Sequence, residues 1–386
     1  MIIKALLCIA FLSTAMICRA QDVSFIVLGD MHYDRLDDHD LDYVTTRPQD
    51  YQQIFNEYPQ YTAFFMPKFL QVIKRQSEKF TPQVKAVVQL GDLTEGVSGN
   101  FTLATKMNRG VVDMMHSVKL PVPWVLVKGN HDVSNSPGQP QAWEEVLRPF
   151  MEGQVNKTVN HGMYTFQISD DVELFVLDQF FSVDRNLPET EMIAFLEREL
   201  GRSKARHKFI LTHQPVIPMS QRCWHLLSGI RRPVADTTLR EKFLNLLAKH
   251  KAIVFCAHEH MYSVLSRNTA SGPIVQVMLN SVNRGLEPPQ PKKKDSIFRG
   301  EKWVDDNLTW QPATNSVRRK ILQEEKGHIG RFSIADLPGY AMISIVDGEV
   351  IMRFFNGLSE TPYEQLNLTA LQKNSGAVLP GKSSRR

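Results

Sequence analysis

The sequence predicts an α/β fold built on parallel strands, and three observations support this. Short apolar runs rich in Val, Ile, Leu and Phe recur without alternating polar residues, which is typical of strands buried on both faces. Segments with apolar residues at three- and four-residue spacing separate most of these runs, as amphipathic helices would. Most runs also end in polar side chains, and parallel sheets bind ligands at the carboxyl ends of their strands.

Six runs are predicted to be buried strands, and four segments between them are predicted to be helices. The strands are Val23–His32, Val84–Asp92, Val122–Asp132, Glu173–Gln179, Lys208–Pro215 and Ala252–Tyr262. The helices are 61–80, interrupted by Pro67, then 104–118, 189–205 and 236–250. The helix at 189–205 follows Pro188 and has acidic residues in its first turn, as a helix start should.

After Tyr262 the alternation of strands and helices ends. The segment 272–282 predicts another strand, and 340–355 predicts two strands joined by Asp347-Gly348, a strong two-residue hairpin signal. A Pro- and Lys-rich stretch predicts an exposed loop or cap insertion over 283–335. The domain is expected to span 21–360, and the tail 361–386 is expected to be poorly ordered.

The N-terminus has the layout of a secretory signal peptide over residues 1–20. Lys4 precedes an apolar stretch from Ala5 to Ile17, and small residues precede Gln21. The stretch is too short for a comfortable membrane span, and no later segment is long enough to be one. We therefore expect a secreted or periplasmic protein without a membrane span. Whether the four N-x-S/T sequons are used depends on the source, which the sequence leaves open.

The charge and the cysteine content indicate which partners and which disulfide bonds to expect. Net charge is +4, from 45 basic and 41 acidic residues mixed along the chain, so no specific binding of nucleic-acid duplexes is expected. Removal of the signal peptide would leave Cys223 and Cys256. The two could pair in an exported protein, but packing of Cys256 as a small buried hydrophobe is favoured. The oligomeric state is left open.

Polar clusters follow five of the six predicted strands, and each alone is compatible with an ordinary strand end or turn. The strand at 173–179 offers only Asp178 and Gln179. The clusters after the other five contain Asp30, His32, Asp92, Asn130, His131, Asp132, His213, His258 and His260. Taken together they form D-x-H, G-D, G-N-H-D, H and H-x-H, in that order.

With these motifs in this order, the chain resembles the calcineurin-like metallophosphoesterase superfamily, with a class III phosphodiesterase-like motif set. The matching stretches are "GDMH" (29–32), "GD" (91–92), "GNHD" (129–132), "THQP" (212–215) and "AHEH" (257–260). The resemblance extends from Phe25 to Tyr262. It implies a four-layer α/β/β/α sandwich with the site at the carboxyl ends of the strands. Ala257 departs from the family pattern, which usually has glycine before the H-x-H motif.

The resemblance also implies a role for each motif residue. One metal would be held by Asp30, His32, Asp92 and His260, and the other by Asp92, Asn130, His213 and His258. Asp92 would bridge the two metals. His131 would stay off the metals and act as general acid, and Asp132 would orient either the loop or the His131 imidazole. Glu259 is not expected to be a ligand.

The residue types themselves suit two divalent ions. Carboxylate, amide and imidazole donors serve Zn, Mn, Fe or Ni, and the absence of thiolates argues against a closed structural zinc site. Two ions roughly 3.5–4 Å apart clamp the attacking and leaving oxygens of an in-line displacement, and coordination lowers the pKa of water to about 7. The implied function is hydrolysis of phosphate esters by a metal-bridging hydroxide. Phosphodiesters are favoured as substrates; the alternatives are an acid-phosphatase-like monoesterase and a non-catalytic metal-binding protein.

Two further segments are weaker candidates for a functional role. Arg222 and Arg231 lie between the last two motifs and could hold a phosphate or another anionic part of a small substrate. The acidic segment Asp34–Tyr43 is expected to be a solvated loop.

Overall fold

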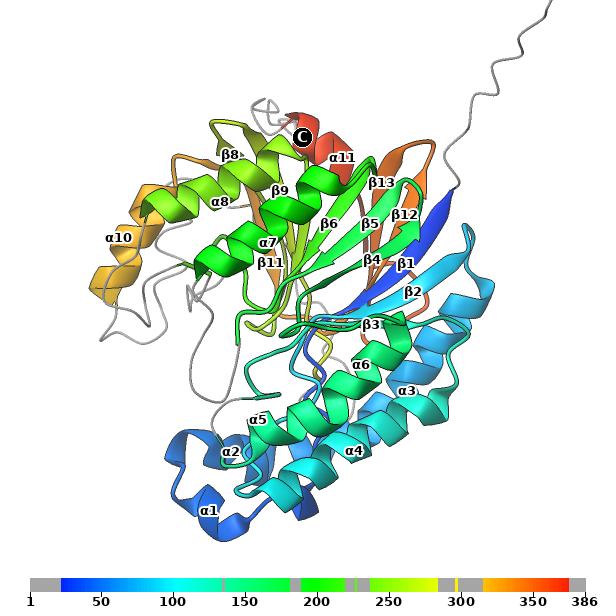
Figure 1. The fold of residues 1–386 in the computed structure, drawn as a ribbon, viewed down its shortest axis with the longest axis vertical. Helices are drawn as coiled ribbons and strands as arrows, with labels where there is room; N and C mark the ends of the chain where they lie inside the picture. Colours follow the sequence, from blue (N-terminus) through cyan, green and yellow to red (C-terminus); the bar gives the residue numbers. More distant parts are fainter. Residues whose placement is uncertain are drawn as a thin grey trace, which may run out of the picture.

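Two sheets pack face to face, with helices on their outer faces (Figure 1). The computed structural model describes residues 22–133, 136–180, 189–218, 226–227, 237–283, 296–297 and 315–374. The four layers confirm the predicted α/β/β/α sandwich.

The first sheet has three parallel strands at one side and three antiparallel strands at the other. Its strand order is β14-β13-β12-β1-β2-β3. The parallel strands are β1 (Val23–Leu28), β2 (Val84–Gln89) and β3 (Trp124–Leu126), and the antiparallel strands are β12 (Gly339–Val346), β13 (Glu349–Asn356) and β14 (Glu364–Asn367). Every residue of β1 is buried, as its unbroken apolar run predicts.

The second sheet has the order β10-β11-β8-β9-β7-β6-β5-β4. Its parallel centre consists of β5 (Val172–Val176), β6 (His207–Leu211), β7 (Ile253–Cys256) and β9 (Gly272–Met278). The antiparallel edges are β4 (Tyr164–Ser169) on one side and β8 (Tyr262–Thr269), β11 (Ile329–Ala335) and β10 (Ser296–Ile297) on the other. The predicted parallel pairing is therefore present in both sheets.

Helices cover the outer face of each sheet (Figure 1). The first sheet carries α3 (Tyr58–Lys79), α4 (Phe101–Val118) and α6 (Arg148–Val155), and the second carries α7 (Glu189–Arg202) and α8 (Thr237–Lys249). The other helical elements described are η1 (Leu36–Asp38), α1 (Leu41–Thr45), α2 (Pro48–Asn56), α5 (Gln139–Ala142), the π-helical η2 (Trp143–Leu147), α10 (Asn315–Glu325) and α11 (Leu368–Asn374). Within the described ranges, none of the helices has the length and apolar character needed to span a bilayer.

Aromatic side chains join the two sheets across the central layer. The Phe25 ring of β1 lies edge-on to Phe209 of β6, with ring centroids 5.0 Å apart, and 6.3 Å from Phe255 of β7. Tyr262 of the second sheet stacks on Phe354 of the first at 3.8 Å. Such contacts add to the burial energy of large rings, so the two sheets are held in a fixed relation.

Three sequence-based expectations are wrong. Helix α3 continues through Pro67, because its long apolar face, including Phe65 and Phe69, is buried against the first sheet and outweighs the missing N–H. Part of the predicted 283–335 insertion belongs to the fold: β11 pairs with β8 and buries Phe332. Part of the tail is also ordered, since β14 pairs with β13 and α11 buries Leu368.

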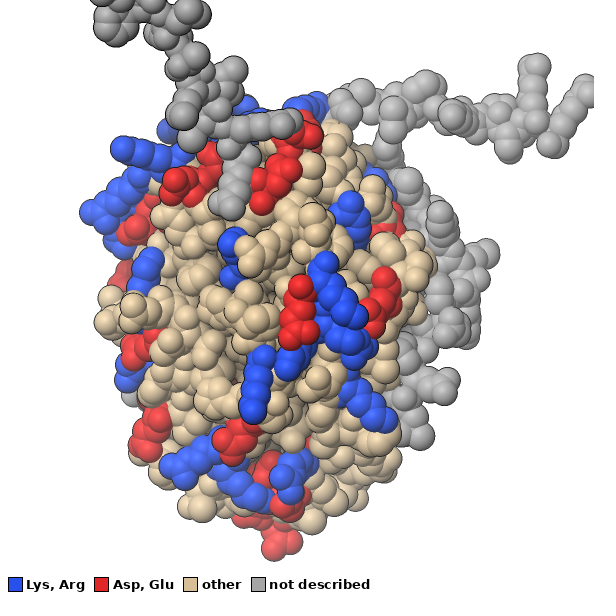
Figure 2. Space-filling model, turned by 90° about the vertical axis from the view of Figure 1, so that its right-hand side faces the viewer, with Lys and Arg blue, Asp and Glu red and all other residues tan. Residues whose placement is uncertain are grey.

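Surface charge is mixed on the face drawn in Figure 2. Basic and acidic side chains are interspersed there among uncharged residues. This distribution agrees with the small net charge of the chain, +4.

Candidate metal centre

The polar clusters predicted from the sequence meet at one edge of the sandwich. Asp30, Asp92 and Asn130 follow β1, β2 and β3, while His213 and His258 follow β6 and β7 of the facing sheet. Parallel strands bring their carboxyl ends to a common edge, so residues far apart in sequence converge. The structure brings together all seven predicted ligand residues and His131.

A first group consists of Asp30, His32 and His260, whose potential ligand atoms all lie within 4.8 Å of one another. The Nε2 atoms of His32 and His260 are 3.0 Å apart. Tyr58 at the start of α3 supports both rings: it stacks on His32 at 4.7 Å, and its hydroxyl lies 3.4 Å from His260 Nδ1. Asp30 and His32 are fully buried.

A second group consists of Asp92, His213 and His258, again within 4.8 Å. His213 Nε2 lies 3.2 Å from Asp92 Oδ2, 3.1 Å from His258 Nδ1 and 3.1 Å from Asn130 Oδ1. Asp92 Oδ2 is also 3.6 Å from His32 Nε2 in the first group. Asp92 therefore lies between the two groups.

Hydrogen bonds fix the orientation of two of the imidazoles. His32 Nδ1 lies 2.6 Å from Glu95 Oε2, and His213 Nδ1 lies 2.8 Å from the Leu90 carbonyl oxygen. Both partners accept, so Nδ1 of each ring carries a proton and Nε2 is the nitrogen that faces the group and could bind a metal ion. Metal-binding histidines are held in this way by an outer partner. The donor set and its orientation thus fit divalent metal ions.

Glu95 is a site residue that the sequence-based reasoning missed. It is fully buried, contacts His32, and places Oε1 3.6 Å from His131 Nδ1. Its potential ligand atom lies within 4.8 Å of those of His32 and His131. The available signal was an acid three residues after Asp92, in "GDLTEG". Tyr58 had no comparable signal, because it begins a helix far from any motif.

His131 is held beside the two groups by its own backbone and ring. Its backbone N–H donates to Asp92 Oδ1 at 2.8 Å, and its Nδ1 lies 2.6 Å from the Glu95 carbonyl oxygen. Nδ1 must therefore carry a proton, which leaves Nε2 for a ligand. Its side chain is 18% exposed, whereas those of His213 and Asp92 are 0% and 1% exposed. His131 is thus the more accessible group.

Asp132 orients the loops rather than the imidazole. Its carboxylate is fully buried and accepts from the backbone N–H groups of Gly129, Leu93, Asp92 and Thr94, at 2.8, 2.9, 3.1 and 3.3 Å. The loops after β2 and β3 also touch at Gly129, where a Cβ would lie 2.1 Å from the Asp92 backbone nitrogen. Only glycine permits this approach.

Four of the candidate ligands have a strained backbone conformation. Positive φ angles occur at His32 (42°), Asp92 (53°), His258 (78°) and His260 (54°). Such conformations cost free energy in non-glycine residues and are typical of functional sites. Ala257, which stands where the family usually has glycine, does not have a positive φ and so has an ordinary backbone conformation. The positive φ angles of this turn occur instead at His258 and His260.

Burial and mutual proximity shift the acid–base properties of the cluster. Burial raises the pKa of Asp30 to about 7 and that of Asp132 to about 6. Burial opposes the charge on Asp92, but His213 and His131 outweigh it and hold the Asp92 pKa well below its usual range. Burial also opposes protonation of His213, but Asp92 outweighs it and raises the His213 pKa to about 9.

We expect the metal-free protein to lose stability as the pH rises from about 5 to about 9. Between the ordinary Asp pKa of 3.8 and about 7, the folded state binds more protons at Asp30 than the unfolded state does. His213 behaves in the same way between 6.5 and about 9. Both contributions are therefore lost as the pH rises through the folded-state pKa. Thermal unfolding of chelated and metal-loaded protein across this range checks the prediction, and a flat profile for the chelated protein would contradict it.

A buried ion pair links the loops of the two sheets next to the site. Lys128, two residues before Asn130, donates to Asp178 Oδ2 at 2.5 Å, and both side chains are at most 1% exposed. The ammonium also lies 3.8 Å from the centroid of the Trp143 ring. Asp178 follows β5 in the second sheet, so the pair joins the Asn130 loop to the facing sheet.

Replacement of Lys128 by Met is expected to lower the free energy of unfolding by about 3–5 kcal/mol, because Asp178 would be left buried without its cation. Urea unfolding measures the effect. Lys373→Met is the matched control, since Lys373 pairs with Glu349 at 2.9 Å but the two side chains are 64% and 35% exposed. The double variant Lys128→Met, Asp178→Asn should recover part of the loss. An equal cost for the two lysine variants would rule out the buried pair as a stabilising contact.

The remaining predictions have mixed outcomes. Arg222, Arg231 and Cys223 lie outside the described residues. Cys256 packs in the core as part of β7 and is fully buried, as predicted. The expectation of a solvated loop over Asp34–Tyr43 is wrong for part of the segment, because His39 and Asp34 are buried and lie 2.7 Å apart, between His39 Nε2 and Asp34 Oδ1.

Comparison with known sequences identifies the family. The sequence profile of the calcineurin-like phosphoesterases matches residues 23–262, more than half of the 386-residue chain. The chain belongs to this family of metal-dependent phosphoester hydrolases, which confirms the resemblance inferred from the motifs.

Similar curated proteins are named as serine/threonine-protein phosphatases. Human serine/threonine-protein phosphatase CPPED1 (Homo sapiens) is 24% identical over 192 residues, which cover 47% of this chain and 55% of the human protein. The bovine protein of the same name (Bos taurus) is 25% identical over 191 residues, with the same coverage. The chain therefore spans about half the length of the curated relatives it matches.

Solved structures share the fold at low sequence identity. PhoD has a TM-score of 0.51 and 12% identity, over 90% of this chain and 68% of PhoD. Purple acid phosphatase PPD1 from yellow lupin (Lupinus luteus) has a TM-score of 0.51 and 11% identity, over 90% of this chain and 53% of that protein. At this identity the likeness shows the fold.

Proposed function

We propose that this protein is a dinuclear-metal phosphoesterase. The observation that carries the proposal is the position of Asp92, which belongs to one largely buried three-residue group and whose carboxylate also faces the other. Imidazole nitrogens and carboxylate oxygens lie close together in both groups. Each group offers at least one carboxylate and two imidazoles, a set that suits a divalent ion such as Zn, Mn, Fe or Ni.

In this proposal Asp30, His32 and His260 hold one ion, and Asn130, His213 and His258 hold the other, with Asp92 shared between them. Bound ions supply the Lewis acidity that activates water and neutralises charge on phosphate oxygens. The chain supplies the geometry: Glu95 and Leu90 orient the imidazoles, and Asp132 fixes the two loops that carry Asp92 and Asn130.

His131 has a separate role as general acid. Its Nδ1 is held by the Glu95 carbonyl oxygen, and its partly exposed ring is available to a substrate. A proton on Nε2 would pass to the leaving oxygen as the ester bond breaks. Asp132 acts only through the loop, as a positioning residue.

We infer phosphate monoesters as the main substrate class. The likeness to a serine/threonine-protein phosphatase and to a purple acid phosphatase supports this reading. The sequence-based preference for phosphodiesters is the rival reading, because the motif set alone does not rank the two classes.

An assay of residues 21–386 with matched esters tests the proposal. We expect 4-nitrophenyl phosphate to be hydrolysed with a higher kcat/KM than bis(4-nitrophenyl) phosphate in the presence of Mn²⁺ or Zn²⁺, and activity to disappear on chelation. The reverse order would establish the diesterase reading. If the metal-loaded protein turned over neither ester, the non-catalytic alternative would replace the enzyme.

Export is a further part of the proposal. The charged and apolar layout of residues 1–20 supports cleavage after Ala20. N-terminal sequencing of the protein recovered outside the cytoplasm should begin at Gln21. Recovery of the uncleaved chain from the cytoplasm alone would overturn this part.

A further inference from the structure

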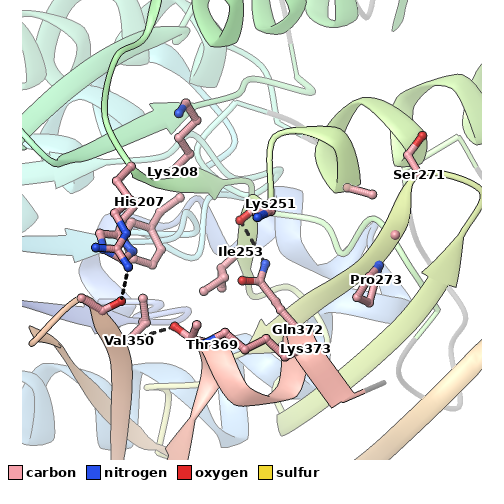
Figure 3. A pocket seen from close by; sticks show the side chains of 15 residues that line it. His207, Lys208, Lys251, Ile253, Ser271, Pro273, Val350, Thr369, Gln372 and Lys373 are labelled. Carbon is pink, nitrogen blue, oxygen red and sulfur yellow. Dashed lines mark hydrogen bonds between the residues drawn. The ribbon is translucent and has the colours of Figure 1, made fainter. Parts of the chain in front are cut away.

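A cavity lies at the edge of the sandwich opposite the metal centre, where β6, β7 and β9 begin. Its volume is about 390 Å³. The walls come from the starts of these three strands, from the turn between β12 and β13, and from α11. In Figure 3, Ile253 lies between His207 on one wall and Gln372 of α11 on the other. The proposed metal ligands follow the far ends of β6 and β7, so the cavity is separate from the metal centre.

The walls of this cavity carry positive charge. Four cationic residues line it, and no Asp or Glu occurs among the described lining residues; the four are Arg206, Lys208, Lys251 and Lys373. Lys373 is paired at 2.9 Å with Glu349, and Lys208 donates to the Ala205 carbonyl oxygen. Arg206 and Lys251 are exposed and give the cavity a net preference for an anion.

The turn between β12 and β13 contacts and positions the side chain of Arg206. The guanidinium donates to the Gly348 carbonyl oxygen at 3.4 Å. A Cβ at position 348 would lie 2.6 Å from Arg206 Nη1, and Gly348 has a φ of 74°. Glycine therefore allows the guanidinium to lie directly on the turn, which holds the charge at the mouth of the cavity.

His207 provides a polar group without a partner. It is 9% exposed, and its buried Nε2 has no hydrogen-bond partner among the described residues. Burial, and then the charge of Arg206, lower the His207 pKa, so the ring is neutral near pH 7. Buried polar atoms normally have a partner, and a ligand in the cavity would supply one.

The floor of the cavity is apolar. Phe209, Ile253 and Val350 line it and are 0%, 3% and 1% exposed. An apolar chain would make van der Waals contact with this floor, whereas the water shell of a fully hydrated ion would meet no polar partner there. The volume lies at the low end of ligand pockets, roughly 300–1,000 Å³. The cavity thus fits a ligand with a small apolar body and one anionic head.

We propose that this cavity binds a small amphiphilic anion, with its head beside Arg206 and Lys251 and its aliphatic chain over Ile253 and Val350. The shared chemistry is an aliphatic chain of medium length that carries a carboxylate or a sulfonate. This site is independent of the proposed hydrolytic function, because it uses none of the residues of the metal centre.

Isothermal titration calorimetry of the metal-loaded chain tests the site with four probes. Octanoate and octanesulfonate are expected to bind at one site and to compete, and comparison of the two identifies the preferred head. Octanol lacks the charge and sulfate lacks the chain, so each should bind at least tenfold more weakly. None of the four is a phosphate ester, so turnover does not interfere. Equal affinity for octanol, or for sulfate, would overturn the proposed ligand class.

Substitution then locates the site. The double variant Arg206→Ala, Lys251→Ala should weaken octanoate binding at least tenfold, and the control Arg202→Ala, Lys249→Ala, which makes the same charge change at nearby residues that do not line the cavity, should not. Methyl NMR should show octanoate-dependent shifts at Ile253 and Val350. Binding to the first double variant within twofold of wild type, or an absence of these shifts, would place the anion elsewhere and refute the proposal.

Discussion

Replacement of His131 by Ala is expected to lower kcat by about 10²–10⁴-fold while two metal ions remain bound per chain. The ring contacts the Glu95 carbonyl oxygen through Nδ1, and the position of His131 in the loop is fixed by its backbone N–H on Asp92. The Ala variant keeps that backbone contact, so the metal centre should persist. Steady-state kinetics and metal analysis on the same preparation measure the two effects.

Substrates with different leaving groups distinguish a catalytic role for His131 from a structural one. If His131 protonates the leaving oxygen, the loss should be larger for an alkyl phosphate than for 4-nitrophenyl phosphate, whose leaving group needs little protonation. His116→Ala serves as the control, because His116 is an exposed histidine on α4. A parallel loss of metal and activity would identify His131 as a ligand, and an equal loss for both substrates would argue against general acid catalysis.

The sequence predicted the parts of this fold that depend on short-range patterns. Unbroken apolar runs identified the buried strands because both faces of β1 and β7 are covered. Hydrophobic patterns did not predict elements whose formation depends on partners distant in sequence. The strand β14, with the sequence EQLN, is polar, and it forms because β13 offers an edge to pair with. No local signal reports the presence of such an edge.

The site residues also fall into two classes: those that local sequence predicts and those that depend on contacts with distant parts of the chain. The ligand types were predictable because each follows a strand end, and parallel strands align those ends. Glu95 and Tyr58 act from outside the motifs, on His32 and its neighbours, and their contacts depend on how loops and helix α3 pack. The Lys128–Asp178 pair was missed because its members lie 50 residues apart, on different sheets. Outer contacts of this kind are specified by the tertiary structure.

Replacement of Asp92 by Asn is expected to weaken both metal sites and to lower kcat/KM by more than about 100-fold, because the loss of an outer partner alone costs about 10–100-fold. Asp92 Oδ2 lies 3.2 Å from His213 Nε2 and 3.6 Å from His32 Nε2, so one carboxylate oxygen faces both groups. Asn preserves the shape and the acceptor for the His131 N–H but removes the charge. Metal content after dialysis, together with kcat/KM, measures the outcome.

Comparison with a second variant separates a bridging role from an ordinary ligand role. Asp30 belongs only to the first group, so Asp30→Asn should release one ion and leave the other in place. Asp113→Asn, at an exposed position on α4, controls for the loss of one carboxylate and should keep both ions. If Asp92→Asn lost one ion, as Asp30→Asn does, the carboxylate would serve a single site and the dinuclear arrangement would need another bridge. If it lost none, the position of Asp92 between the two groups would reflect packing alone.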